Sequence, residues 1–291
     1  MQISAWDVAA VGIKAILYAA TLSAAGGVFF LFYSAALVSA EHQRGIRRWI
    51  GICTAVGLAA SALRLSILAG SMGETAVSLV DGEMIRMILG AGEARATGIR
   101  VAGLLLIASL ATTCRPSLLA VLGAVIAATS FAWIGHAWAI PTHDLSLALV
   151  SLHLVGIAFW LGALVPLLII ARGSELRLIA SAAGRFGHIA MVIVTVLLAA
   201  GTFLLWLLLD ALSDLWNTDY GRAILLKLVL VSGILSLAAF NKSVLTPRLE
   251  SNELRALTRL RRSIQIEMVL GSLILIVTAI FTTTMGPSTL D

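Results

Sequence analysis

Two histidines in apolar sequence are the strongest candidates for chemistry in this chain. His153 opens the run HLVGIAFWLGALVPL at residues 153–167, and His136 lies in WIGHAW at residues 133–138. Neutral imidazole binds copper and zinc well, whereas lipid offers a lone imidazole no water. Only the short connection AIPTHD separates the two segments, so antiparallel packing would bring both rings to one cavity. We predict a metal site at His136 and His153, with His143 of the connection as a further ligand.

Methionine thioethers extend this candidate site, because sulfur suits Cu(I). Met84 and Met87 share a face of an amphipathic segment at residues 76–90, and Met72 lies shortly before it. We predict that these three methionines receive the ion first. Each candidate also has a structural interpretation, in which an imidazole bonds to a neighbouring hydroxyl or carbonyl and a thioether packs as an apolar side chain. The residues alone leave both interpretations open.

These candidate side chains lie in long apolar segments that we expect to form helices. The 291 residues are 60% hydrophobic and 12% charged, with a mean hydropathy of +1.02, which indicates a polytopic membrane protein. A helix needs about 20 apolar residues to cross a bilayer. Eight windows meet this need, approximately residues 8–37, 49–71, 97–113, 118–139, 144–171, 186–209, 221–244 and 263–284. We expect an all-α fold with eight transmembrane helices in one domain, residues 1–291, without a separate soluble domain and with the first window kept as a span rather than cleaved.

Basic residues in the connections set the expected orientation. Thirteen of the twenty lysines and arginines fall in residues 41–48, 114–117, 172–185 and 242–262. Basic loops stay on the cytoplasmic side, so both termini are expected on the outer side. The segment at residues 76–90 is too short and too charged to span, and we place it outside as an interfacial or re-entrant helix. The basic residues are scattered over loops and form no nucleic-acid module, so no nucleic-acid partner is expected beside the lipid bilayer.

Charged residues within the predicted spans indicate cavities, ion pairs or chemistry. Four cations lie in or near the outer half, where they repel a bare metal ion: Lys14, Arg64, Arg100 and Lys227. We expect them to snorkel to the surface, to bind an anionic group such as a haem propionate, or to pair with the acids Glu93, Asp210, Asp214 and Asp219. Glu267, near the inner side, is expected to pair with Arg261 or Arg262 or to take part in proton coupling.

Two rival functions follow from the same residues. In the first, His136 and His153 are axial ligands of haem b, and Arg64, Arg100 or Lys227 face the propionates. In the second, the protein senses metal or acts as a scaffold without transport. A Soret band would identify the haem protein, and copper flux in sealed vesicles separates a transporter from a sensor.

Several segments together resemble the CopD (copper resistance protein D) family. The resemblance rests on the two histidine segments, on RFGHIA at 185–190, on DYGRAILLKLVLVSGILSLAAFNKSVLTPRL at 219–249, and on LRRSIQIEMVLGSLILIVTAIFTTTMGP at 260–287. The last three segments in this order are specific, whereas each alone is weak. The likeness is clear over the C-terminal half and rests mainly on topology in the first four helices.

The resemblance implies copper transport across the bacterial inner membrane, with a separate periplasmic copper-binding protein of the CopC type as donor. It places His153, Trp160, Gly162 and Pro166 in the family's HLxxxxFWLGxLxPL motif and His136 in its GHA motif. Trp160 is expected to pack the site, and the exit is expected among the inner ends of the second, third and sixth spans. No enzymatic activity and no nucleotide-binding loop are expected.

Overall fold

The fold is all-helical wherever the computed structural model describes the chain. The described residues are 4–73, 81–90, 92–111, 117–134, 143–208 and 213–284, and no strand occurs within these ranges. The predicted all-α class is therefore confirmed. His136, Asp210 and Met285 lie outside the described residues.

Six helical spans are long and apolar enough to cross a membrane: Ala5–Leu37, Ala40–Met72, Asp144–Ala171, Leu176–Trp206, Gly221–Glu250 and Leu254–Thr283. They contain α1 (Ala5–Ser34) with the 3-10 turn η1 (Ala35–Leu37), α2 (Ala40–Gly73), α7 (His143–Ala171), α8 (Leu176–Leu208), α10 (Asp219–Phe240), the π-helix η5 (Asn241–Leu245), α11 (Thr246–Glu250) and α12 (Leu254–Thr284). The protein is therefore a multi-pass membrane protein with at least these six candidate spans.

The third and fourth predicted spans form shorter helices. α4 (Gly92–Ala108) continues into the 3-10 turn η3 (Ser109–Ala111), and α5 (Leu118–Thr129) continues into η4 (Ser130–Trp133). Two further short helices are α3 (Gly82–Leu89) and α9 (Asp214–Asn217). α3 falls within the predicted amphipathic segment, and its eight residues are too few to span a bilayer.

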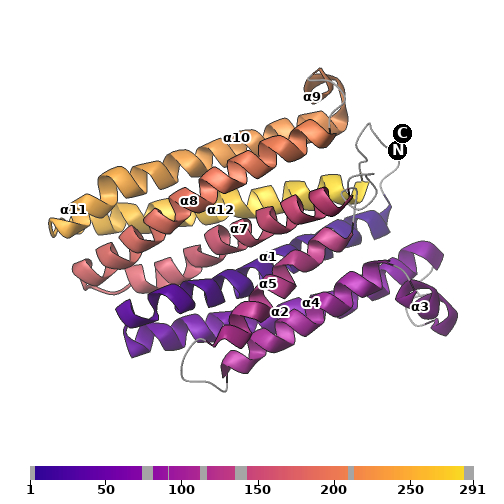
Figure 1. Cartoon of the computed structure of the whole chain (residues 1–291), viewed down its shortest axis with the longest axis horizontal. Coiled ribbons are helices and arrows are strands. Elements are labelled where there is room, and N and C mark those ends of the chain that lie inside the picture. The colour runs from indigo at the N-terminus through magenta and orange to yellow at the C-terminus, as the bar shows by residue number, and fades with distance from the viewer. Residues whose placement is uncertain are drawn as a thin grey trace.

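The long helices lie side by side and alternate in direction (Figure 1). The start of α1, the end of α12, α3 and α9 lie at one end of the bundle, which we call the terminal end. The starts of α2, α8 and α12 lie with α11 at the opposite end. We call this opposite end the basic end, because Arg44, Arg172, Arg177, Arg248 and Arg255 lie in these helix starts, in α11 and in the turn before α8.

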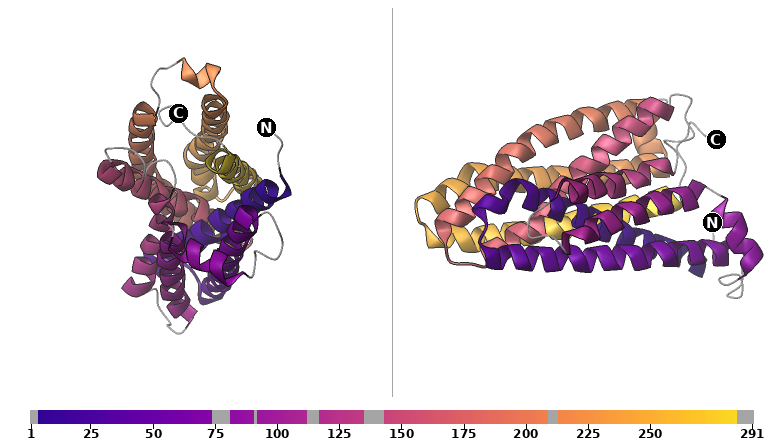
Figure 2. Two further views of the ribbon diagram at one scale, coloured as in Figure 1. Left: turned by 90° about the vertical axis from the view of Figure 1, so that its right-hand side faces the viewer. Right: turned by 60° about the horizontal axis from the view of Figure 1, so that its bottom comes forward.

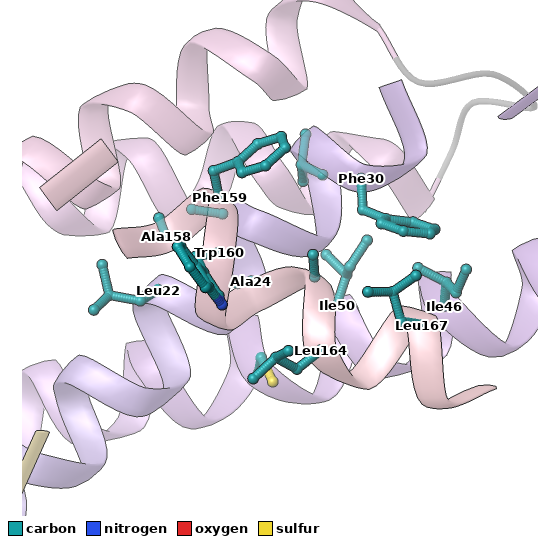
Figure 3. Close-up of a cluster of buried hydrophobic side chains, with 14 of the residues drawn as sticks. Leu22, Ala24, Phe30, Ile46, Ile50, Ala158, Phe159, Trp160, Leu164 and Leu167 are labelled. Carbon is teal, nitrogen blue, oxygen red and sulfur yellow. The ribbon is translucent and has the colours of Figure 1, made fainter. Parts of the chain in front are cut away.

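α1 is the central helix of the bundle and packs against α2, α5, α7 and α12. Viewed end-on, α9 and α10 lie at one edge of the molecule and α4 and α5 at the other (Figure 2). The core joins α1 and α2 to α7, where Phe30, Ile50, Phe159, Trp160 and Leu164 pack together (Figure 3). α7 therefore holds the motif of His153 against the centre of the fold.

Small residues let α1 and α7 approach closely. A Cβ atom built on Gly162 of α7 would lie 2.5 Å from the Cα atom of Gly26 on α1. A Cβ atom on Gly156 would lie 2.6 Å from Cδ2 of Leu197 on α8. Small residues at such crossings allow backbone-to-backbone packing in membranes. Gly162 therefore allows α7 to pack against the backbone of α1, and α7 continues through Pro166 to Ala171.

The outer faces of α8 and α10 are apolar. Val192 and Trp206 on α8 and Val229 on α10 are among the most exposed large hydrophobic side chains of the described chain. A soluble protein rarely exposes such a surface, whereas lipid solvates it without penalty. This half of the bundle therefore faces the bilayer.

Candidate functional site

His153 lies on the inward side of α7, between α7 and α8. A Cβ atom built on Gly201 of α8 would lie 4.0 Å from Cε1 of the His153 ring. Nδ1 of His153 is buried and has no hydrogen-bond partner among the described residues. A buried polar nitrogen without a partner is rare in folded proteins. The structural interpretation expected a hydrogen bond from this histidine to a neighbouring hydroxyl or carbonyl. Among the described residues, Nδ1 has no such partner.

Lys227 of α10 faces the same region. Its ammonium is near enough for its charge to act on the imidazole of His153, and its Nζ atom lies 5.8 Å from the ring centroid of Phe281 on α12. The region around His153 is thus bordered by α7, α8, α10 and α12. The ammonium contributes positive charge next to the candidate ligand, as expected from its place in the sequence.

The other predicted ligands are dispersed or outside the described residues. The α7 helix begins at His143, whose side chain is not described, so the convergence of His136 and His143 on His153 stays a prediction. Met72 and Met87 are exposed and Met84 is partly exposed, at the end of α2 and on α3. Within the described ranges, no three His, Cys, Asp or Glu side chains gather closely enough to hold a metal ion.

A second polar region lies among α1, α2 and α4. Nε of Arg64 on α2 donates to Oε1 of Glu93 on α4 at 3.2 Å, and both side chains are mostly buried. Glu93 was one of the acids expected to neutralise the outer cations, and this pairing is confirmed. Asp219 instead pairs with Arg222, one turn away on α10, in an exposed contact.

Arg100 on α4 is fully buried. Its Nε donates to Oγ of Ser130 at 3.1 Å, and its guanidinium carbon lies 4.1 Å from the ring centroid of Phe131. Its two terminal nitrogens have no hydrogen-bond partner among the described residues. The cation–π contact with Phe131 stabilises the charge at this depth, and Tyr18 of α1 packs against the same ring.

Lys14 reaches the end of α12. Its Nζ atom donates to the carbonyl oxygen of Thr282 at 2.9 Å. A carbonyl at the last turn of a helix carries partial negative charge and is a favourable partner for an ammonium. Lys14 therefore joins α1 to α12 rather than pairing with an acid.

Glu267 on α12 is 2% exposed and accepts a hydrogen bond from Nδ2 of Asn241 on η5. The expected pairing with Arg261 is wrong, because Arg261 donates to the carbonyl oxygens of Ala171 and Gly173. Arg262 is exposed and forms no ion pair with Glu267 in the described chain. Arg261 thus caps the end of α7, where backbone carbonyls without an intrahelical partner accept its N–H groups.

Trp160 is the link between α7 and Glu267. It is 7% exposed, lies in the core beside Phe159 (Figure 3), and lines the same cavity as Glu267. Nε1 of Trp160 has no hydrogen-bond partner among the described residues. Trp160 therefore packs in the core and shares a cavity wall with a buried acid.

Asn241 and the π-helix around it were not predicted from the sequence. The local signal is the polar pair Asn241–Lys242, which follows the apolar run of α10 shortly before Pro247. A π-helix has i→i+5 hydrogen bonds, and short π segments occur frequently at functional sites. Residue types alone do not reveal where such a bulge forms.

Comparison with protein families matches both parts of the chain. The model of the copper resistance protein D family matches residues 180–281, and the model of the copper resistance protein D-like N-terminal domain matches residues 4–141. No curated protein and no solved structure matches the chain. Neither family match supports the haem b alternative.

Proposed function

The chain belongs to the copper resistance protein D family, and on that premise we propose that it transports copper across the bacterial inner membrane. The observation that carries the proposal is the buried Nδ1 atom of His153, which has no partner in the described chain. Neutral imidazole nitrogen is a good copper ligand. In a copper resistance protein, a transported copper ion is the partner that this nitrogen lacks.

We propose that His136 supplies a second imidazole from the segment that precedes α7. Met72, Met84, Met87 and His143 would receive the ion at the terminal end and pass it to this pair. The ammonium of Lys227 beside His153 weakens cation binding by electrostatic repulsion. Weakened binding serves transport, because an ion must leave its site as well as enter it.

We propose eight membrane crossings, with both termini on the periplasmic side. α4 with η3 has 20 residues and α5 with η4 has 16. At about 1.5 Å per α-helical and 2.0 Å per 3-10 residue, these lengths give roughly 31 Å and 26 Å, near the thickness of the hydrocarbon core. The basic residues of the basic end then face the cytoplasm, as the positive-inside rule requires.

We further propose that a separate periplasmic protein of the CopC type delivers the copper. The chain would act as one transmembrane domain that moves the ion without catalysing a reaction. The exposed methionines of the terminal end are flexible, polarizable side chains, which suits them to exchange copper with such a donor.

Copper uptake into sealed vesicles containing the pure protein tests this function. We expect His153→Ala and His136→Ala each to abolish most of the uptake, because each removes one imidazole of the proposed pair. His42→Ala is the matched control, since His42 is exposed and its Nδ1 already contacts Oγ of Ser39 at 2.7 Å. Wild-type uptake by His153→Ala vesicles would refute the proposal, and copper binding without any flux would favour the sensor instead.

A further inference from the structure

A cavity of about 560 Å³ lies in the half of the bundle nearer the basic end. Its walls come from the second half of α7, the first half of α8, the end of α10 with η5, and the first half of α12. The cavity is mainly apolar, and the polar side chains in its wall include Thr195, Asn241, Lys242, Ser243, Thr246 and Glu267. It does not coincide with the exit expected from the sequence among the second, third and sixth spans.

Glu267 is the acidic residue of this wall. It is 2% exposed, and Asn241 is the residue that donates to it with full hydrogen-bond geometry. Lys242 lines the same cavity, but its Nζ atom donates to the carbonyl oxygen of Gly187 at 3.2 Å. No lysine or arginine of the described chain forms an ion pair with Glu267. A buried carboxylate in apolar surroundings needs a cation or a proton.

The π-helix η5 brings a second oxygen-bearing side chain, that of Asn241, to the wall of this cavity. Asn241 is the first residue of η5, and its amide nitrogen bonds to Glu267. Its amide oxygen Oδ1 is buried and has no partner in the described chain. Thr246 donates to the backbone carbonyl of Asn241 at 2.9 Å, which supports the widened turn. The carboxyl group of Glu267 and the unpartnered amide oxygen of Asn241 thus belong to two bonded residues that line one cavity.

The same wall lies in line with His153 along α7. Trp160 follows His153 by seven residues, which is two helical turns and about 10.5 Å along the axis. Residues seven apart share one helix face, and Trp160 lines the cavity together with Glu267 and Asn241. The cavity wall therefore lies about two helical turns from His153 along α7, towards the basic end.

We propose that the carboxylate of Glu267 and Oδ1 of Asn241 form a second cation site, which takes the copper ion after His153 and releases it into the cavity. This inference rests on the proposed function and adds an inner site to it. Two oxygen donors suit Cu(II) better than Cu(I), so Cu(II) is the form that this site binds.

Cu(II) bound per chain, measured by equilibrium dialysis of the purified full-length protein, tests the second site. We expect about one ion fewer per chain in Glu267→Gln, with the His153-dependent ion kept. His153→Ala should lose a different ion, and the double variant should lose both. Glu250→Gln, at the exposed end of α11, is the control and should bind as the wild type does.

The outcomes separate this inference from the proposed function. Loss in Glu267→Gln with no loss in His153→Ala would support the inner site and overturn the histidine site. Loss only in His153→Ala would overturn the inner site alone. Loss of transport in Glu267→Gln with unchanged Cu(II) binding would also overturn it, because Glu267 would then carry a proton rather than the metal.

A second variant tests the same inner site in case the Glu267→Gln protein does not fold. Asn241→Ala keeps the carboxylate and removes Oδ1, and we expect it to weaken the inner site about tenfold, the effect of losing one good polar contact. Trp160→Phe should keep the bound ion but lose part of the fluorescence quenching by Cu(II). An unchanged inner-site affinity in a folded Asn241→Ala protein would contradict the proposal.

Discussion

Arg64 and Glu93 form a mostly buried ion pair between α2 and α4, with side chains 11% and 17% exposed. Removing one partner of a fully buried pair costs about 3–5 kcal/mol, because the other charge stays in an apolar environment. Partial exposure reduces this, so we expect Glu93→Gln to lower the free energy of unfolding by about 1–3 kcal/mol. Thermal unfolding in detergent measures the change.

The exposed pair Arg222–Asp219 is the matched control, with side chains 63% and 81% exposed. We expect Asp219→Asn to change the stability by no more than about 0.5 kcal/mol, since surface ion pairs contribute little. Equal melting temperatures for Glu93→Gln and the wild type would show that Arg64 does not depend on this acid.

Lys227 of α10 should lower the affinity of the His153 site for copper. Its ammonium repels a cation on His153, so Lys227→Met should bind copper about tenfold more tightly, for roughly 1.4 kcal/mol of repulsion removed. Competition with a copper chelator measures the affinity. Arg222→Met, on the exposed side of the same helix, should leave the affinity as it is. Weaker binding in Lys227→Met would mean that Lys227 holds the site together instead.

Residue types predicted that a polar His153 lies within an apolar helix, and they predicted the outer cations and the acid Glu93, because a polar group in an apolar window is conspicuous in any sequence. The role of His153 as a metal ligand stays a prediction. Residue types did not predict the hydrogen-bond or ion-pair partner of each charged side chain. Lys14 bonds to a helix carbonyl, and Arg261 to the turn between α7 and α8. Glu267 bonds to an asparagine in the π-helix. These choices depend on which helices become neighbours, which hydropathy does not encode.

At the scale of the elements, the crossing of α1 and α7 is the most demanding contact. A leucine at Gly162 would overlap the backbone of α1 at Gly26. We expect Gly162→Leu to lower the free energy of unfolding by about 1–3 kcal/mol, as overpacking does, and to disturb copper binding at His153 on the same helix. Thermal unfolding and copper binding measure the two effects.

Gly51 on α2 provides the comparison, because no atom lies within 4 Å of a Cβ built there. Gly51→Leu should therefore melt close to the wild type. A Gly162→Leu protein with wild-type stability would show that α1 and α7 can move apart without a loss of stability. The close approach of the two helices would then not stabilise the fold.

Hydropathy predicted the existence of every long helix but not all of their bounds. α2, α8 and α12 begin at Ala40, Leu176 and Leu254, about ten residues before the predicted spans. Those first turns carry the arginines of the basic end, which an apolar window excludes although helices accept them readily. The shift from α-helix to π-helix at Asn241 left no signal in apolar periodicity, since it depends on hydrogen bonding within the packed bundle.

For the whole molecule, eight crossings predict the side on which each connection lies. In a cysteine-free background, Ser213→Cys beside α9 should react with a membrane-impermeant maleimide in intact spheroplasts. Ser117→Cys at the start of α5 and Ser251→Cys after α11 should react only after permeabilisation. Ser213 and Ser251 are exposed and Ser117 is partly exposed, so the side of the membrane decides the result. Labelling of Ser117→Cys in intact spheroplasts would contradict the crossing by α4.

In the proposed function, the imidazole of His153 inside this bundle holds copper. X-ray absorption at the copper edge of the purified, copper-loaded protein detects such a ligand. We expect the outer-shell scattering of imidazole in the wild type, and its reduction in His153→Ala but not in His42→Ala. Identical spectra for the wild type and His153→Ala would show that this imidazole does not bind the ion.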